Sequence, residues 1–296
     1  MKVTSATSPT RGGTSAAPRR LPRLSGRTLI LVGLGVYALF VAFPLYWAVN
    51  TSFKEPSEVL SQPPTFLPEE PTTSGYSWFV GGGTALPALL DSLTVTFLAT
   101  IAAVALGTLA GYAFSRYPRQ VGGGRLAFWL LSTRIFPPIA TALPLFFLYD
   151  TLNLLDSHFG LALAYFIFNV PLATWLMRTF FDDVPRSFEE AAYLDGYGRF
   201  ATFRKVVLPL VQPGLVATTI LVALFSWNEF LFALVLGGAN VQTVPVLIPQ
   251  LASGFETQWN QIAVLSLAAM IPPVLAVIFF RDRLTRGMSL GVVKRR

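Results

Sequence analysis

The sequence predicts an all-α integral membrane protein with six transmembrane helices and with both termini in the cytoplasm. Of the 296 residues, 53% are hydrophobic and 12% are charged, which is about half the ~25% charged fraction of soluble domains. Long apolar runs lack charges, and the Lys and Arg residues gather between alternate runs. This composition excludes a water-soluble globule.

The first apolar run covers residues 28–49 and contains no charged residue. At ~1.5 Å per residue, a helix of this length crosses a hydrocarbon core of ~30 Å. The run is longer than the ~7–15 residues of a signal-peptide core, and no small-x-small cleavage site follows it, so we expect a retained helix. Five further helices are expected at residues 92–115, 126–149, 159–177, 214–236 and 262–280.

Local signals refine three of these helices. Asp91 and Ser92 can cap the second helix, because their short side chains accept hydrogen bonds from free backbone N–H groups. The third helix is interrupted by Arg134 and by the pair Pro137 and Pro138. The fifth is expected to stop at the Gly-Gly pair that follows residue 236.

The sequence divides into three parts. Residues 1–27 are rich in Ser, Thr, Pro, Gly and Arg and cannot bury enough apolar surface to fold, so we expect a disordered cytoplasmic tail. Residues 28–281 form the six-helix transmembrane domain, with a Pro-rich outer loop at 50–90 and an inner loop at 186–209. Residues 282–296 form a cytoplasmic C-terminal tail.

The Lys and Arg residues predict the sidedness, because such residues near helix ends are retained in the cytoplasm. Twenty of the 22 lie before the first helix, between the second and third, between the fourth and fifth, or after the sixth. Lys54 in the outer loop and Arg134 within a helix are the exceptions. The formal net charge of +7 is therefore a topology signal, and no nucleic-acid partner is expected.

The chain contains no Cys and one His, His158. These counts exclude disulfides and thiolate metal sites and leave no histidine cluster for a metal. An intramembrane hydrolase is disfavoured as well. No G-x-S-x-G elbow is present, and His158 lies in an expected outer turn, where we expect a solvated side chain.

The outer loop at 50–90 contains six prolines together with Tyr76, Trp78 and Phe79. Proline at this density excludes long helices and central strands. Two interpretations stay open. The loop is a docking surface for an external partner, or it is irregular chain that lies over the helix ends with its aromatic side chains in the membrane interface.

The loop between the fourth and fifth helices is predicted to form a short helix, a turn and a second helical segment. Ser187 can cap the first helix, and Glu190, three residues later, completes a capping box. Gly196 provides a left-handed terminator. Ala191 and Ala192 leave a face without bulk, which lets the groove of another protein approach closely. We therefore expect a helix-turn-helix that protrudes into the cytoplasm.

The spacing within this loop is specific. Glu190-Ala191-Ala192 is followed after three residues by Gly196, and after nine more by Val206-x-Leu208-Pro209. This pattern resembles the EAA loop of binding-protein-dependent ABC importer permeases, with Val where Ile is commoner. The resemblance implies coupling to ATPase subunits through Glu190, Ala191, Ala192, Asp195, Gly196, Leu208 and Pro209. The alternative is an amphipathic connector that rests on the lipid surface.

Two further segments resemble the maltose-type carbohydrate permeases, namely residues 227–233 (WNEFLFA) and residues 286–294 (RGMSLGVVK). The resemblance implies a type I ABC importer permease architecture and a multi-pass position in the bacterial cytoplasmic (inner) membrane. In the family the tail reaches between the ATPase subunits, which implies ATPase contacts for Gly287, Gly291 and Lys294. A basic tail that lies on anionic lipid is the alternative.

The chain lacks the phosphate-binding pattern G-x-x-x-x-G-K-[ST], since no lysine follows a glycine. We therefore expect a non-catalytic subunit without a cofactor, with ATP and Mg²⁺ bound by a partner ATPase. The resemblance implies a second homologous permease, two ATPase subunits, an extracytoplasmic solute-binding protein and membrane lipid as partners. The implied function is ATP-driven import of a sugar, an oligosaccharide or a polyol, with this chain forming half of the translocation path.

Four residues of the predicted helices are candidates for that path: Arg134, Trp227, Asn228 and Glu229. A charge ~14 Å inside the membrane is costly, so Arg134 is expected to face a cavity or a partner. Side chains of these types bind sugars by ring stacking and bidentate hydrogen bonds. The structural alternative pairs Arg134 with Glu229 or with the second permease. A stand-alone secondary transporter or channel is the competing function, although no inverted repeat is evident.

Overall fold

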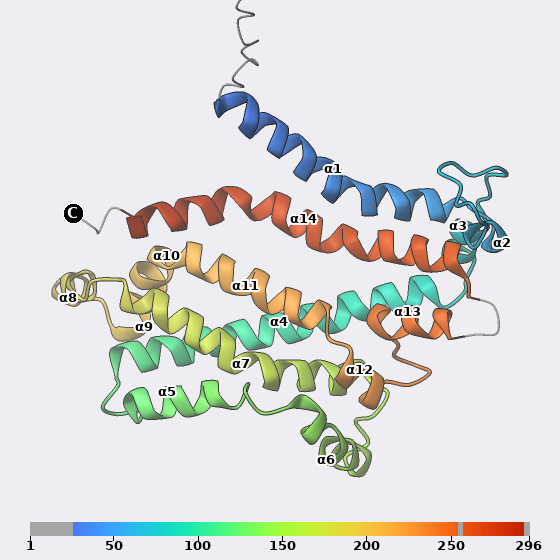
Figure 1. Cartoon of the computed structure of the whole chain (residues 1–296). Coiled ribbons are helices and arrows are strands. Elements are labelled where there is room, and N and C mark those ends of the chain that lie inside the picture. Colours follow the sequence, from blue (N-terminus) through green and yellow to red (C-terminus); the bar gives the residue numbers. More distant parts are fainter. Residues whose placement is uncertain (1–25, 254–256, 293–296) are drawn as a thin grey trace, which may run out of the picture. The chain divides into compact units, whose positions relative to one another are not determined.

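The computed structural model describes residues 26–253 and 257–292. Within these ranges every regular element is a helix and no strand occurs (Figure 1). The chain divides between Tyr46 and Trp47 into two units, and each is described by itself. Apart from its last two residues, the expected tail at 1–27 lies outside the described residues.

The first unit contains most of helix α1 (Gly26–Ser52). This helix confirms the predicted apolar run and continues through Pro44. Apolar residues are spread around the whole helix. Such a helix has no polar face to turn toward water, which is typical of a segment that crosses a membrane.

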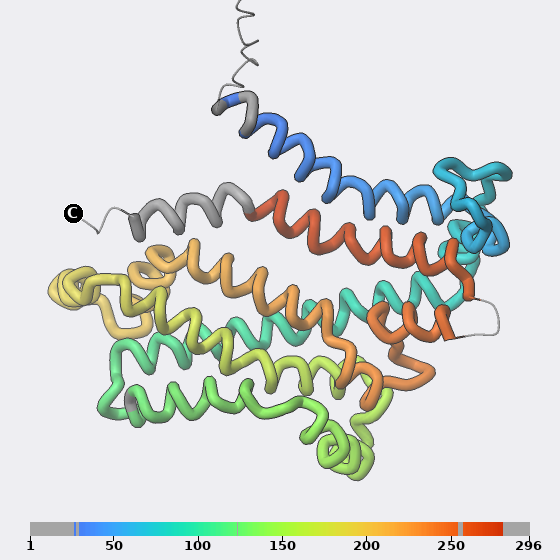
Figure 2. The backbone as a smooth tube through the Cα atoms, viewed as in Figure 1, coloured from blue at the N-terminus to red at the C-terminus, as the bar shows by residue number. Residues whose placement is uncertain are grey.

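The second unit is built around two long helices, α4 and α7, that lie side by side (Figure 2). A third, α11, packs against both, and α14 packs against α11. The bounds of these helices are α4 Ala85–Arg116, α7 His158–Asp182, α11 Gln212–Trp227 and α14 Trp259–Val292. They correspond to the second, fourth, fifth and sixth predicted helices, and all but α11 extend beyond the predicted ends.

Glycines bring α4 and α7 into close contact. A Cβ atom at Gly107 would overlap Ala173, and one at Gly111 would lie 2.8 Å from the backbone nitrogen of Arg178. Interior packing leaves no room for such atoms, so any larger side chain would push the helices apart. The backbones of the two helices are therefore in direct contact at these glycines.

The third predicted helix is broken where its prolines predict a break. It consists of α5 (Gly123–Ser132) and α6 (Pro138–Thr151). Pro138 is the first residue of α6, and Pro137 before it is extended with ψ 120°. This follows because a residue that precedes proline avoids the α region.

The fifth predicted helix is also divided, which the sequence did not predict. Helix α11 ends at Trp227, and α12 (Leu231–Leu236) begins after a break that contains Asn228 and Glu229. The expected stop after residue 236 is confirmed, because Gly237 follows α12 in an extended conformation.

Four described helices are long and apolar enough to cross a membrane: Ile30–Ser52, Ala85–Arg116, His158–Asp182 and Trp259–Phe280. A fifth span results if the segments Arg199–Leu210 and Gln212–Trp227, which are bent by 76°, form one broken span. The two halves of the third predicted helix have 10 and 14 residues, so neither is long enough to cross a membrane alone. The all-helical class and apolar helices suited to a membrane are confirmed, and the number of six spans stays a prediction.

The predicted caps of the second helix were wrong. Helix α4 begins several residues earlier, so Asp91 and Ser92 lie inside it. Their side chains instead hold the first residue of α13 (Val244–Ala252) and the chain just ahead of it. The Gln242 N–H donates to Asp91 Oδ2 at 3.0 Å, and the Val244 N–H donates to Ser92 Oγ at 2.8 Å.

The His158 side chain is 43% exposed, in keeping with the expected solvation, but the residue does not lie in a turn. It is the first residue of α7, and its Nε2 lies 2.7 Å from Oδ1 of Asp91 in α4. The residue before it, Ser157, caps α7 by accepting a hydrogen bond from the Gly160 N–H at 3.1 Å. The beginning of α7 is thus fastened to α4.

The Pro-rich outer loop contains only the short helices α2 (Pro56–Val59) and α3 (Ser74–Val80) before α4 begins, as its prolines predicted. Lys54 is buried there and donates to the carbonyl oxygen of Thr65 at 2.5 Å. The Thr65 hydroxyl donates in turn to Glu58 Oε1 at 2.6 Å. The segment is therefore an ordered structure that is held by its own polar contacts.

Within the second unit, the 186–209 loop and the connection from α4 to α5 lie at one end, and α2, α3 and α13 lie at the opposite end (Figures 1 and 2). Both segments at the first end are rich in Arg and Lys. This grouping is the one expected if both face the same side of a membrane.

Candidate functional site

The 186–209 loop forms the expected helix, turn and second helical segment. Gly196 follows the first helix with φ +86°, so the predicted left-handed terminator is confirmed. A Cβ atom there would meet no neighbour, so the backbone conformation and not the available space favours glycine. The elements are α8 Ser187–Leu194, α9 Arg199–Thr202, the π-helical turn η1 Phe203–Val207 and α10 Leu208–Leu210.

The predicted capping box does not form. Ser187 is already a helical residue, and no side chain caps α8. Glu190 is exposed, whereas the neighbouring Glu189 is buried. Residues three apart share one helix face, so Glu189 and Ala192 both turn toward the protein while Glu190 points away from it.

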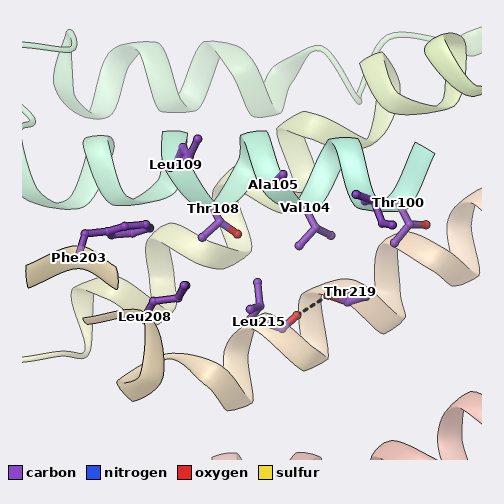
Figure 3. A pocket seen from close by; sticks show the side chains of 10 residues that line it. Thr100, Val104, Ala105, Thr108, Leu109, Phe203, Leu208, Leu215 and Thr219 are labelled. Carbon is purple, nitrogen blue, oxygen red and sulfur yellow. Dashed lines mark hydrogen bonds between the residues drawn. The ribbon is translucent and has the colours of Figure 1, made fainter. Parts of the chain in front are cut away.

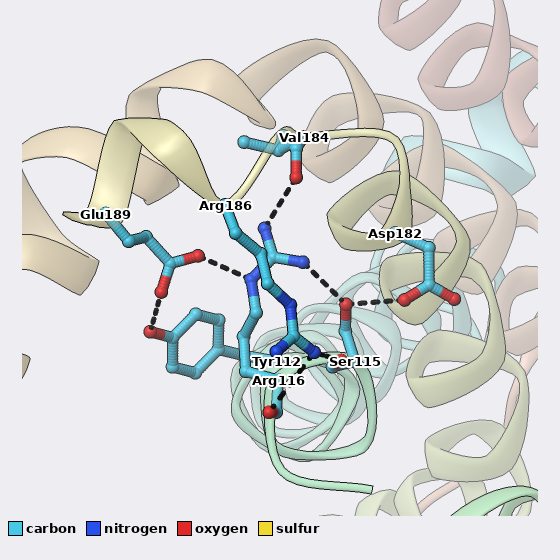
Figure 4. Close-up of polar contacts among 7 residues, drawn as sticks. All are labelled: Tyr112, Ser115, Arg116, Asp182, Val184, Arg186 and Glu189. Carbon is cyan, nitrogen blue, oxygen red and sulfur yellow. Dashed lines mark hydrogen bonds and ion pairs between the residues drawn. The ribbon is translucent and has the colours of Figure 1, made fainter. Parts of the chain in front are cut away.

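The buried face of α8 is joined to α4 by an ion pair (Figure 4). Nε of Arg116, the last residue of α4, donates to Oε1 of Glu189, and the Tyr112 hydroxyl donates to Oε2 at 2.8 Å. The two charged side chains are only 5% and 7% exposed. Arg116 also donates through Nη2 to the carbonyl oxygen of Val184 at 2.9 Å.

Ser115 and Arg186 extend this cluster to the end of α7 (Figure 4). The Ser115 hydroxyl donates to Asp182 Oδ1 at 2.5 Å and accepts from Arg116 Nη1 at 3.0 Å. Arg186 donates to the backbone carbonyl of Ser115 at 3.3 Å. Carbonyl groups at the C-terminal end of a helix lack intrahelical partners and favour positive charge, which explains two arginines at this place.

The opposite face of α8 and the following turn are exposed. Glu190, Ala191 and Asp195 lie on this surface. Leu194 is 90% exposed and Phe200 is 73% exposed. Large apolar side chains beside carboxylates are typical of a surface that a protein partner covers. Two alanines were expected to form an exposed face without bulk. Only Ala191 is exposed, because Ala192 lies on the buried side of α8.

The second arm of the 186–209 loop is packed into the membrane domain. Val207 is fully buried, and the Phe203 ring centre lies 4.8 Å from that of Tyr112. Leu208 is half-buried and Pro209 is exposed. An apolar groove of about 440 Å³ continues from this arm between α4 and α11 (Figure 3).

A second candidate site is a small polar cavity of about 100 Å³, between the α5–α6 break, the middle of α7 and the α11–α12 break. It contains both Arg134 and Glu229. The Arg134 guanidinium lies 4.8 Å from the centre of the Phe225 ring and donates to Asn169 Oδ1 at 3.5 Å. Glu229 accepts through Oε1 from the Phe232 N–H at 3.0 Å.

Two of the four predicted path residues therefore share one cavity. Among the ion pairs of the described residues, none joins Arg134 to Glu229. Trp227 lines a different, apolar groove between α4, α11 and α14. Asn228, which follows α11, donates its side-chain amide to the Leu224 carbonyl of that helix at 2.8 Å.

Sequence reasoning missed Asn169 and Tyr165 of α7, which support the cavity. Asn169 is buried and donates through Nδ2 to the Ser226 hydroxyl at 3.1 Å and to the Tyr165 carbonyl at 3.0 Å. The Tyr165 hydroxyl donates to the backbone carbonyl of Glu229 at 3.2 Å. An amide in the middle of an apolar run was the available signal, because polar groups in a membrane are costly.

The C-terminal candidates are only partly described. Gly287 and Gly291 lie in the last turns of α14, whose backbone continues to Val292. Lys294 lies outside the described residues. The expected ATPase contacts of these three residues stay predictions.

Comparisons with a family model and with individual proteins point to the same family. The family described as "Binding-protein-dependent transport system inner membrane component" matches residues 103–290. The trehalose transport system permease protein SugB of Mycobacterium tuberculosis is 34% identical over 259 residues, which cover 86% of this chain and 93% of that protein. The sulfoquinovosyl glycerol transport system permease protein SmoH of Agrobacterium fabrum is 30% identical over 271 residues, which cover 91% and 95%.

A solved structure has the same fold. It is a chain of a bacterial ABC transporter involved in the import of the acidic polysaccharide alginate. The two chains superpose with a TM-score of 0.70 over 88% of this chain and 99% of the other, at 24% identity.

Proposed function

Because the chain belongs to the family of binding-protein-dependent transport system inner membrane components, we propose that it is the permease subunit of an ATP-driven importer of a sugar, an oligosaccharide or a polyol. Relatives named as permeases for trehalose and for sulfoquinovosyl glycerol align with it over more than nine-tenths of their length, which supports this class of solute. The main observation behind the proposal is that α8, in a chain of this family, has an exposed face.

ATP hydrolysis takes place in a partner. The exposed face of α8, with Glu190, Ala191 and Leu194, fits into a groove of an ATPase subunit whose rim carries positive charge. The complex contains two ATPase subunits, a second homologous permease and an extracytoplasmic solute-binding protein. This chain contributes half of the translocation path and binds neither ATP nor Mg²⁺ itself.

The chain crosses the bacterial inner membrane six times, with both termini and the 186–209 loop in the cytoplasm. The α5–α6 pair forms the third span as a broken helix, and the α11–α12 pair forms the fifth. The clustering of basic segments at one end of the second unit supports this arrangement. The 1–27 and 282–296 segments are the cytoplasmic tails.

The polar cavity lies on the translocation path. Helix breaks leave backbone groups without intrahelical partners, and such groups are tolerated at membrane depth only where protein or a cavity surrounds them. Arg134 and Glu229 supply charged hydrogen-bond donors and acceptors there, and Phe225 supplies an aromatic face. These are the groups that bind sugar hydroxyls and sugar ring faces.

Purification under mild conditions tests this function. A tagged chain that is extracted from its host membrane is expected to co-purify with an ATPase and a second permease. Proteoliposomes with the whole complex are expected to take up labelled trehalose or maltose only when ATP and the solute-binding protein are present. Uptake by the chain alone, driven by a proton gradient, would instead identify a secondary transporter.

A further inference from the structure

We propose that the buried Arg116–Glu189 ion pair is a rigid joint, which passes the ATP-driven movement of α8 on to α4. This inference rests on the proposed function of the chain as an ABC importer permease. Arg116 and Glu189 then act as positioning residues for coupling, in addition to the exposed residues of α8 that face the ATPase.

The first argument is that few side chains of α8 are buried against the rest of the chain, and only one of these is charged. Only two of its eight residues are buried, Glu189 and Ala192. An isolated helix of this length is marginal in water, so its position depends on contacts with the rest of the chain. Ala192 contributes a methyl group, and the exposed Tyr193 interacts with two tyrosines at the end of α4, so the Glu189 carboxylate is the buried charged anchor of the helix. The backbone connection to α7 runs through four residues, from Asp183 to Arg186.

The second argument is that the carboxylate fixes orientation as well as position. Its two oxygens accept from two residues of α4, Arg116 and Tyr112, which lie one helical turn apart. A carboxylate that is held at two points cannot rotate about a single bond. Hydrogen bonds between charged groups in a buried site are also stronger than those between neutral groups.

The third argument concerns what α4 contacts beyond this joint. Helix α4 packs closely against α7 at Gly107 and Gly111. Near its other end, Asp91 and Ser92 accept hydrogen bonds from the start of α13 and the chain just ahead of it. At ~1.5 Å per residue, Asp91 lies ~37 Å along the helix from Arg116. A displacement of α8 therefore reaches the opposite end of the second unit through one continuous helix.

A pair of introduced cysteines tests the joint, because the chain contains no other Cys. The variant Arg116→Cys/Glu189→Cys is assembled into the whole complex in proteoliposomes, with trehalose and maltose as the transported probes. Before cross-linking, we expect the number of sugar molecules moved per ATP to fall by about tenfold, a change within the range of coupling energies between contacting residues. Cross-linking the two cysteines with a short bifunctional maleimide is expected to restore this ratio.

Two results would overturn the inference. A wild-type ratio before cross-linking would mean that the joint is not needed, and a further loss after cross-linking would mean that the pair must open during transport. Glu189→Gln provides a second measure that does not depend on cysteines, since it keeps the volume and an acceptor for Tyr112. Its ratio is expected to fall in the same direction, and a wild-type ratio in this variant would equally overturn the inference.

The controls separate the joint from general effects. Arg119→Gln removes an exposed charge from the connection between α4 and α5, at the same end of the second unit, and is expected to leave the ratio unchanged. The maleimide applied to the wild-type complex controls for the reagent. Failure of the proposed function would look different, because the wild-type complex itself would then take up neither sugar in response to ATP.

Discussion

In the polar cavity, the hydrogen bond and the ring contact of the Arg134 guanidinium are to neutral groups, although the Glu229 carboxylate lines the same cavity. The ring of Phe225 and the amide oxygen of Asn169 contact the guanidinium, and Glu229 lies in the same cavity without an ion pair to it. A guanidinium has five N–H donors, and one of them is bonded to Asn169. This arrangement suits a solute that brings its own hydroxyl acceptors.

Replacing Arg134 with Leu is expected to leave assembly intact and to reduce transport by about tenfold or more. Leucine keeps an apolar contact with Phe225, whereas a lost hydrogen bond from a charged group costs about 1.5–3 kcal/mol. Uptake of labelled trehalose or maltose by the reconstituted complex is the measurement. Arg125→Leu, which alters an exposed arginine of α5 outside the cavity, is the matched control. Unchanged uptake in a normally assembled Arg134→Leu complex would remove Arg134 from the path.

Individual residues differ in how far the sequence reveals them. Arg134 and Glu229 could be found because a charge in an apolar run is costly and therefore conspicuous. Glu189 could not be distinguished from Glu190, because the choice depends on which face of α8 lies against α4. Its partner Arg116 is 73 residues away in the sequence, so no local pattern connects the two.

The exposed face of α8 can be tested by reversing one charge. Glu190→Lys is expected to preserve insertion and pairing of the permeases but to abolish ATPase association or solute-stimulated hydrolysis, because the carboxylate would no longer meet a basic ATPase residue. Co-purification and ATP hydrolysis are the measurements, with Lys205→Gln on the second arm as a control. If α8 only rests on lipid, the new lysine should be harmless beside anionic headgroups, and normal stimulation would reject the coupling role.

The outer loop is expected to lose stability in acid. The hydrogen bond from the Thr65 hydroxyl lowers the pKa of Glu58 from its usual value of 4.5. A lowered folded-state pKa stabilises the segment above the unfolded-state pKa, and this contribution is lost as the pH falls through the lowered value. Hydrogen-exchange protection of residues 53–72 should therefore decrease below about pH 4. Thr65→Val should weaken this pH dependence. Protection that does not change with pH in the wild type would contradict the prediction.

Helix positions were predictable to different degrees, for physical reasons. The α5–α6 break follows from Pro137 and Pro138, whose geometry acts locally. The α11–α12 break contains no proline, and Asn228 and Glu229 are compatible with a helix interior, so only tertiary contacts decide that the helix ends there. The early start of α4 was missed because Asp91 and Ser92 resemble caps but serve as anchors for another segment.

At the scale of the whole molecule, sidedness can be tested with single cysteines. Tyr197→Cys in the 186–209 loop is expected to react with a membrane-impermeant maleimide only after the cells are permeabilised. Leu67→Cys, at an exposed position of the outer loop, is the matched control and should be labelled in intact cells. Both expectations follow from the distribution of Lys and Arg. Labelling at position 197 in intact cells would invert the orientation.

The fold class was predictable as a whole because its determinants are local in sequence. Uncharged apolar runs predict the transmembrane helices, and basic segments predict their orientation. The packing of α4 against α7 could not be read in this way. It depends on Gly107 and Gly111 meeting Ala173 and the Arg178 backbone, which are more than 60 residues away in the chain.

The excess of carboxylates in the outer loop has an electrostatic consequence for the end of the second unit opposite the 186–209 loop. The outer loop, residues 50–90, is described throughout and contains four carboxylates, Glu55, Glu58, Glu69 and Glu70, against the single cation Lys54. The resulting negative potential extends over a Debye length, ~8 Å at physiological ionic strength. A positively charged protein is drawn to such a surface before contact, at a rate that falls as salt is added. An uncharged sugar does not experience this field, so the surface discriminates among macromolecules and is indifferent to a neutral cargo.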